Sequence, residues 1–429
     1  MAGVDGEGRA LARALVCLTV ALAGCPKPEA AAPAKPEPAK PAAAKPASPA
    51  PTAAAPASPA APAKEPPPGP PVREASRQDV EHALEVLIQE VKAGASDPKN
   101  PWALAHGLLA FGPDLKASDG RLAIDVMVHD FIQVEQLYGR TVHRFPQKTK
   151  DDVPVEPHPN LIAKSMVSAG VPLTRSFKLK GGKSVTLKQL VDDAAWAFSM
   201  PTTDADWHQF AWSMDLFLSA YGPKGTLETH VGPIQMSLLV QQGLQKLENE
   251  QGFLLGPMRV GRPDLVEKRR QDIYGHTCGG LHFVQGAVHG AAAVGDPALL
   301  FRAGKQLELV DFRWDAERRM YRQLINTQPK YGFLLLVQEL KFHGHVLETM
   351  ALAHQWGALK ADDATRAQAR RVAADLVDAV AELAPMYKAQ AKLAESTPQT
   401  YYDLIGDGCH AIRGLRQALV AFYAPPAKQ

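Results

Sequence analysis

The chain has 429 residues, enough for one large domain or two ordinary ones, and 46% of them are hydrophobic, as in globular proteins. The formal net charge is only +2. Residues 1–25 are neutral and residues 26–65 carry five lysines against three glutamates, so the remainder of the chain is neutral. Nucleic acid is therefore not an expected partner, because such binding needs a strongly basic face.

Residues 1–24 have the pattern of an export signal. The apolar run from Leu11 to Gly24 is shorter than the roughly 20 residues that span a bilayer, which favours the core of a signal peptide. Leu22-Ala23-Gly24-Cys25 resembles the lipobox of bacterial lipoproteins, in which the cysteine is lipidated and becomes the first mature residue. This resemblance implies a lipid on Cys25 that holds the protein to a membrane. An uncleaved anchor or a simple signal peptide is the alternative.

Pro26 follows the cysteine, where lipoproteins kept at the inner membrane often have aspartate. The lipoprotein resemblance thus implies the cell envelope, at the outer membrane and facing the periplasm. Residues 25–73 are rich in alanine and proline and contain no aromatic residue, so they cannot offset the entropy of ordering. We expect them to form a disordered, partly extended tether that carries a folded domain over residues 74–429.

The folded part shows helical periodicity. Val80, Leu84, Leu87 and Val91 recur at steps of four, three and four, which is typical of one buried helix face. No convincing parallel-sheet pattern is found, so an all-α domain is predicted. Asn100-Pro101 and the Thr186–Gln189 capping box start further helices. Helices are also expected over 161–169, 227–247, 297–309, 316–325, 334–340, 342–354, 364–383 and 402–423, and a small hairpin over 177–187.

The stretch from Tyr274 to Gly290 is the one around which a site is predicted. Gly279 and Gly280 favour a sharp turn into a helix. Beyond that turn, polar side chains at steps of four, three and four share one helix face. They are Cys278, His282, Gln285 and His289.

Two later stretches, Phe342–His354 and Ile405–Leu415, repeat the order of a glycine, a histidine and a mostly apolar helix. We interpret Gly344 and Gly408 as turns that enter helices. Each histidine would then lie at a helix start, where free N–H groups suit an anionic or polyhydroxylated ligand.

We therefore expect His282, His345 and His410 to converge at one mouth of the fold. Glu348, one turn after His345, is expected beside them. Trp212 joins the candidate pocket from a helix whose N-cap is expected to be Asp204. The alternative is that the histidines satisfy buried backbone groups and hold the fold together.

Repeated helical hairpins over roughly residues 76–424, with glycines before the candidate histidines, resemble an α/α toroid. That architecture occurs in terpenoid cyclases, six-hairpin glycosidases, polysaccharide lyases and lanthionine-synthetase cyclases. It implies an inner ring of helices wrapped by an outer ring, with a site at one end. The stretches HPNLIAKSMVSAGVPL, CGGLH, HGHVLE and CHAIRGL are also similar to a group of uncharacterised bacterial envelope proteins.

Lanthionine-cyclase-like toroids bind zinc through two cysteines and a histidine. Cys278, Cys409 and His410 supply the same residue types, which makes them candidate zinc ligands by this resemblance. The Trp-Cys-Tyr-Gly and Cys-His-Gly contexts of that family are absent from the chain. A disulfide between the two cysteines, or two separate buried thiols, are the alternatives. We favour separate thiols and expect no cofactor.

The export signal, the tether and the toroid resemblance favour a lipid-anchored envelope protein that binds or processes an extracytoplasmic glycan or a similar polymer. A non-catalytic envelope scaffold or assembly factor is one alternative, and a zinc-dependent lanthionine-cyclase-like enzyme is another. The chain has no GxSxG motif and no glycine-rich phosphate loop. Whether the protein is an enzyme stays open at this point.

Overall fold

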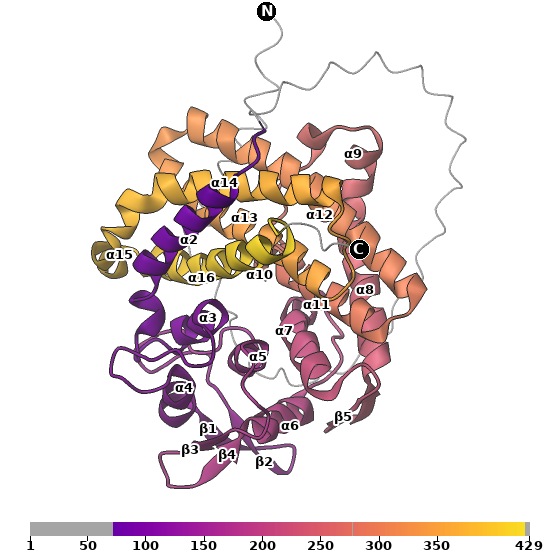
Figure 1. The fold of residues 1–429 in the computed structure, drawn as a ribbon. Helices are drawn as coiled ribbons and strands as arrows, with labels where there is room; N and C mark the ends of the chain where they lie inside the picture. The colour runs from indigo at the N-terminus through magenta and orange to yellow at the C-terminus, as the bar shows by residue number, and fades with distance from the viewer. Residues whose placement is uncertain (1–71, 277, 425–429) are drawn as a thin grey trace, which may run out of the picture. The chain divides into compact units, whose positions relative to one another are not determined.

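The computed structural model describes residues 72–276 and 278–424. The predicted signal peptide, Cys25 and nearly all of the predicted tether lie outside the described residues. The described part is mostly helical, as predicted, with three small two-stranded antiparallel sheets (Figure 1). Among its helices, none combines the length and apolar character needed to cross a membrane.

The first helices begin at side-chain caps, of which the sequence predicted the second, Asn100. In α2 (Arg77–Val91), Ser76 and Asp79 form a capping box. After a 3-10 turn, η1 (Gly94–Ser96), helix α3 (Pro101–Phe111) begins at Asn100, whose side-chain oxygen accepts a 3.0 Å hydrogen bond from the Ala103 N–H. Both helices bury their apolar faces, and they contribute to the core beside the last helix of the chain.

The next segment alternates short helices with hairpins. Helix α4 (Ala123–Phe131) leads into the pair β1 (Gln133–Leu137) and β2 (Arg140–Arg144), with Gln133 opposite Arg144. Helix α5 (Leu161–Ser168) confirms the short helix predicted there. The predicted hairpin is confirmed as β3 (Ser176–Lys178) and β4 (Ser184–Thr186), and the Thr186 capping box opens α6 (Leu187–Ala197).

Two predictions in the following segment are wrong. Asp204 is the first residue of α7 (Asp204–Tyr221), and Thr203 is the N-cap, with Asp206 completing its capping box. The predicted helix over 227–247 begins only at Met236, because β5 (Thr226–Thr229) and β6 (Gly232–Gln235) form a hairpin before α8 (Met236–Gln251). Gly232 and Pro233 are poor residues for a helix interior, which accounts for the difference.

Short elements connect α8 to the central stretch. They are η2 (Gly252–Leu254), α9 (Leu255–Arg259), η3 (Pro263–Leu265) and α10 (Ile273–His276). Helix α11 (Leu281–Val294) then starts after Gly280, whose φ of 86° is left-handed. The predicted sharp entry into this helix is confirmed.

Long helices follow, and they are more continuous than predicted. The pieces expected over 297–309 and 316–325 form one helix, α12 (Pro297–Thr327), which is followed by η4 (Pro329–Tyr331). The pieces over 334–340 and 342–354 likewise form α13 (Gly332–Gln355). The last elements are α14 (Asp363–Tyr387), α15 (Gln390–Ser396) and α16 (Pro398–Ala421).

Gly344 and Gly408 therefore lie inside helices and are not turns. The role of Gly344 is close packing: a Cβ built on it would lie 3.2 Å from the Cα and Cβ of Ala411. Opposite it, a Cβ on Gly414 would lie 2.9 Å from the Gly344 carbonyl oxygen. Missing side chains at these two positions let α13 and α16 approach backbone to backbone.

The packing of the helices joins the two ends of the described segment. α13 packs against α14 and α16, and α16 packs against α2 and α3, so the indigo start and the yellow end lie side by side in Figure 1. α11 packs against α7, α8, α12 and α13. The three helices that carry the candidate histidines, α11, α13 and α16, are thus held together within the core.

Candidate functional site

The three predicted histidines meet in the interior. His282 lies in the first turn of α11, whereas His345 and His410 lie in the middle of α13 and α16. Their ring centroids are 4.9 Å apart for His282–His345, 4.9 Å for His282–His410 and 4.1 Å for His345–His410. We call these three side chains, with Cys278 and Glu348, the histidine cluster. The three histidines and Glu348 come together as expected, but they are buried and do not lie at an open mouth of the fold, and only His282 lies at a helix start.

Glu348 joins the cluster to a cation. Its Oε2 accepts a 2.8 Å hydrogen bond from Nδ1 of His410, and its Oε1 lies 2.7 Å from Nη1 of Arg413. Glu348 is fully buried, which by itself would raise the pKa of its carboxyl group. The adjacent His410 and Arg413 outweigh burial and hold that pKa well below its ordinary value. Glu348 is therefore an anion that fixes both partners.

Each of the three histidines has an oxygen partner on Nδ1. That of His282 is Oε1 of Gln285 at 3.1 Å, and that of His345 is the Lys341 carbonyl oxygen at 2.8 Å. His410 uses Glu348, as described above. Because the acceptors are oxygens, Nδ1 carries the proton in a neutral ring and the lone pair is on Nε2.

Burial keeps two of these rings neutral. It lowers the pKa of His282 and of His345 well below the ordinary value, and the neighbouring histidines lower both further. Nε2 of His345 is buried without a hydrogen-bond partner among the described residues. A neutral imidazole with an unsatisfied lone pair is an uncommon interior group, since buried polar atoms are normally paired.

Trp212 forms one wall of this cluster. Its side chain is buried, and its ring centroid is 5.1 Å from that of His282. On Trp212 the ring of His158 is stacked at 4.1 Å with an angle of 7°. Along α7, Trp212 lies against the cluster, while Asp215 and Ser219 line a cavity.

The two cysteines within the described residues are both free, so no disulfide joins Cys278 to Cys409. The ligand atoms of Cys278, His282 and His345 all lie within 4.8 Å of one another. Cys409 belongs to neither of the metal-ligand groups found among the described residues, so the zinc set expected from the resemblance is not assembled. Neighbouring residues of a helix point about 100° apart, which separates Cys409 from His410.

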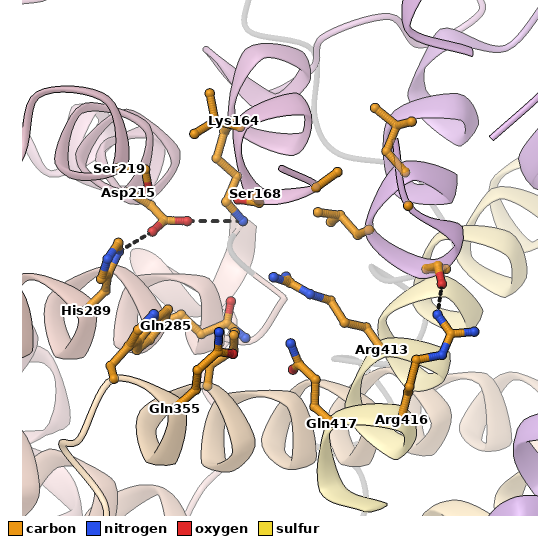
Figure 2. A pocket seen from close by; sticks show the side chains of 18 of the residues that line it. Lys164, Ser168, Asp215, Ser219, Gln285, His289, Gln355, Arg413, Arg416 and Gln417 are labelled. Atoms are coloured by element: carbon orange, nitrogen blue, oxygen red, sulfur yellow. Dashed lines mark hydrogen bonds and ion pairs between the residues drawn. The ribbon is translucent and has the colours of Figure 1, made fainter. Parts of the chain in front are cut away.

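A cavity of about 490 Å³ opens beside the cluster (Figure 2). It is surrounded by α3, α5, α7, α11, α13 and α16. Most of its lining is polar, and Trp356 is the largest aromatic side chain in it. Its charged or strongly polar side chains are Lys164, Asp215, Gln285, His289, Gln355, Arg413, Arg416 and Gln417.

Asp215 organises one side of the cavity. Its Oδ2 lies 3.4 Å from Nζ of Lys164, and its Oδ1 lies 2.7 Å from Nδ1 of His289 (Figure 2). Burial would raise the pKa of this carboxyl group, but the charges of Lys164 and His289 lower it below its ordinary value. The ring of His289 in turn stacks on Trp356, with centroids 4.5 Å apart.

Two residues of the cavity lining connect it to the cluster. Gln285 lines the cavity and donates to Glu348 at 3.3 Å, and Arg413 lines the cavity and binds the other oxygen of Glu348. The candidate pocket residues His282, His345, Glu348, His410 and Trp212 do not themselves line this cavity. The predicted site thus lies directly behind the wall of the cavity.

From the sequence we did not predict the three cationic residues of the cavity, which are Lys164, Arg413 and Arg416. Lys164 had a usable signal, because it is a lone charge within the apolar run Leu161–Met166. Arg413 had one too, since it follows His410 by three residues on the same helix face. Arg416 had none.

Asp407 is buried within α16. Burial raises the pKa of its carboxyl group to about 7, although Lys341 lies 3.4 Å away. It therefore forms with Lys341 a polar pair of the core that is separate from the cluster.

Comparison with protein-family models, curated proteins and solved structures finds no match for the chain.

Proposed function

We propose that the cavity binds a hydrophilic ligand that carries a carboxylate, as a segment of an extracytoplasmic glycan or a similar polymer does. The observation that carries this proposal is the charge of the lining. Lys164, Arg413 and Arg416 face one carboxylate, Asp215, across a cavity whose lining is mostly polar. An anion entering the cavity restores the balance of charge.

The ion pairs of the lining do not neutralise all of its positive charge. Asp215 is shared between Lys164 and His289, and Arg413 donates to Glu348 through Nη1. Arg416 donates from its own Nη1 to the Ala110 carbonyl oxygen, which is a neutral acceptor. A guanidinium has five N–H donors in a fixed fork, which matches the two oxygens of a carboxylate.

The remaining lining suits a sugar. Gln355 and Gln417 supply amide donors and acceptors, and Phe111 and Trp356 supply apolar rings. Sugars combine hydroxyl groups with apolar C–H faces, so a mostly polar lining with aromatic rings matches both. The volume of about 490 Å³ lies within the range of ordinary ligand pockets.

Binding is better supported than cleavage. Hydrolysis by paired carboxylates requires one group that is protonated near neutral pH. Asp215 and Glu348 both have lowered pKa values, so both are anions that fix cations in place. Their arrangement organises the cavity for recognition.

We further propose that the helices form an α/α toroid and that the protein is a lipoprotein of the cell envelope. The convergence of α11, α13 and α16 supports a ring-like core, and the lipobox-like Leu22–Cys25 supports the anchor. The anchor is tested by labelling cells with a clickable fatty acid. Equal label in wild type and Cys25→Ser would contradict it.

Ligand binding is tested by calorimetry on the full chain. The carboxylated probe is a set of short oligogalacturonides, and cello-oligosaccharides of matched length are the neutral probe. We expect the carboxylated set to bind more tightly, and Arg416→Gln to weaken it about tenfold by removing one charged donor. Arg370→Gln, which replaces an arginine of α14 outside the cavity lining, is the matched control.

Equal affinity for both probe sets would refute the charge argument. Binding of neither set would favour the alternative of a non-catalytic envelope scaffold. Equal losses in Arg416→Gln and Arg370→Gln would show that binding depends on general surface charge and not on the cavity.

A further inference from the structure

We propose that Cys278, His282 and His345 form a zinc site, with His410 beside both histidines. This site is distinct from the ligand cavity and does not depend on the function proposed for it. It also differs from the set Cys278, Cys409 and His410, because Cys409 is excluded and two other histidines take part.

The first support is the type and spacing of the donors. One thiol sulfur and two imidazole nitrogens lie within 4.8 Å of one another. A tetrahedral zinc ion holds such atoms roughly 3.3–3.8 Å apart, given its usual bond lengths to sulfur and nitrogen. Movements of at most about 1.5 Å would bring the three donor atoms to this spacing. Sulfur and imidazole together favour zinc over magnesium or calcium, which prefer oxygen.

The second support is independent of spacing and comes from the hydrogen bonds. Histidines that bind metals generally donate their other ring N–H to an oxygen, which orients the ring and fixes the tautomer. His282 and His345 both do so, through Gln285 and the Lys341 carbonyl oxygen. Nε2 of His345, which this arrangement leaves with a lone pair, is fully buried and has no hydrogen-bond partner among the described residues.

The chain also bends sharply to present the thiol. Cys278, Gly279 and Gly280 all have left-handed φ values of 49°, 66° and 86°. A cysteine in this region of backbone conformation is strained and persists only where the surroundings require it. On binding, sulfur donates a lone pair to the ion as a thiolate, and the thiol proton passes to solvent.

The pair of His410 and Glu348 completes the surroundings. Glu348, His345 and His410 form a second close group that shares His345 with the first. Both oxygens of Glu348 already have partners, His410 and Arg413, so this carboxylate acts best as an orienting group for His410. The ring of His410 lies next to that of His345, with centroids 4.1 Å apart.

The test uses the full chain with Cys17 and Cys25 replaced by serine, so that Cys278 and Cys409 are its remaining thiols. Metal is removed with a chelator, and zinc is titrated back in competition with a chromophoric chelator. We expect one zinc ion per chain. Cobalt(II), added as a spectroscopic probe, should give a thiolate-to-metal charge-transfer band.

Two variants and one control decide the outcome. Cys278→Ser should abolish the cobalt band, and both Cys278→Ser and His345→Gln should weaken zinc by more than about 100-fold, since loss of a ligand exceeds loss of an orienting partner. Cys409→Ser replaces the other remaining thiol, which is buried, and should retain both signals. Circular dichroism and melting show whether each variant is folded. Cys278, in a loop and only half-buried, allows the test even where His345→Gln fails to fold.

Substoichiometric zinc in the parent chain would overturn the proposal. So would a cobalt band that survives in Cys278→Ser, or equal losses in Cys278→Ser and Cys409→Ser. Each of these results would mean that the histidine cluster is a metal-free packing element.

Discussion

The histidine cluster and the cavity contain similar residues in opposite environments. The cluster has its imidazoles buried among helices, with one fully buried carboxylate. The cavity has one histidine, one aspartate and three cations around a space of about 490 Å³. Gln285 and Arg413 lie between the two regions: both line the cavity, and both donate hydrogen bonds to Glu348 of the cluster.

The difference teaches how burial decides the role of a polar residue. In the cluster, burial lowers the pKa of His282 and His345, so these rings offer lone pairs instead of charge. In the cavity, Asp215 remains an anion because Lys164 and His289 stand beside it. The first region is suited to a soft or borderline metal ion, and the second is suited to a charged, hydrated ligand.

The largest expected effect follows from removing the shared carboxylate. Glu348→Ala leaves Arg413 and His410 without their buried partner, which should lower the free energy of unfolding by about 3–5 kcal/mol. Chemical denaturation measures this loss. Glu308→Ala, which breaks an exposed pair with Lys305, is the control and should change stability little. Similar losses in both variants would show that the cluster is not a tightly coupled region.

The next effect is a dependence of stability on pH. Burial, and then His410, lower the pKa of His106 from 6.5 to about 3. The ring of His106 lies 5.3 Å from that of His410, and its Nδ1 donates to the Trp102 carbonyl oxygen. The unfolded chain therefore binds a proton between pH 6.5 and 3 that the folded chain excludes.

The sign follows from this difference in bound protons. Stability is full above pH 6.5 and falls as the pH decreases, by about 1.4 kcal/mol per pH unit for such a group. His106→Gln should therefore show a shallower loss between pH 7 and 5 than wild type, by about 2 kcal/mol. Denaturation at several pH values measures the two slopes. Parallel slopes would mean that His106 is hydrated or charged in the folded protein.

Packing of the cluster can be tested with two glycines in long helices. A Cβ on Gly414 of α16 meets the Gly344 carbonyl oxygen at 2.9 Å, so Gly414→Ala should cost about 1–3 kcal/mol. A Cβ on Gly304 of α12 meets no atom within 4 Å, so Gly304→Ala should instead stabilise the protein by about 0.5–1 kcal/mol. Thermal melting compares them. Two shifts of the same sign would contradict the close approach of α13 and α16.

The glycines also show how far the sequence could predict the site. The shared order of glycine, histidine and apolar residues correctly indicated that His345 and His410 lie together with His282. The reason was different: Gly344 is a packing position within a helix, and a glycine that permits a turn cannot be distinguished locally from one that permits contact. Helix starts with strong caps, such as Asn100 and Thr186, were predictable because their signals are local.

What escaped prediction depends on contacts between distant segments. Lys164 meets Asp215 across two helices, and Arg416 enters the cavity by reaching Ala110 of α3. No local pattern encodes such meetings. The hairpin β5–β6 was not predicted for another reason. The apolar residues around it have helical spacing, and this pattern was given more weight than the turn signal of Gly232-Pro233.

The smallest expected effect on stability gives the sharpest separation of the two regions. Trp356→Ala removes the stacking partner of His289 and should cost about 0.5–1.5 kcal/mol, because the indole is only half-buried. It should weaken the carboxylated oligosaccharide about tenfold and leave zinc affinity unchanged. Cys278→Ser should do the reverse, losing zinc and keeping the oligosaccharide. Calorimetry with both probes on both variants measures this pattern. If either variant lost both ligands, the cluster and the cavity would be one coupled site joined through Gln285 and Arg413, and the separation argued from their burial would be wrong.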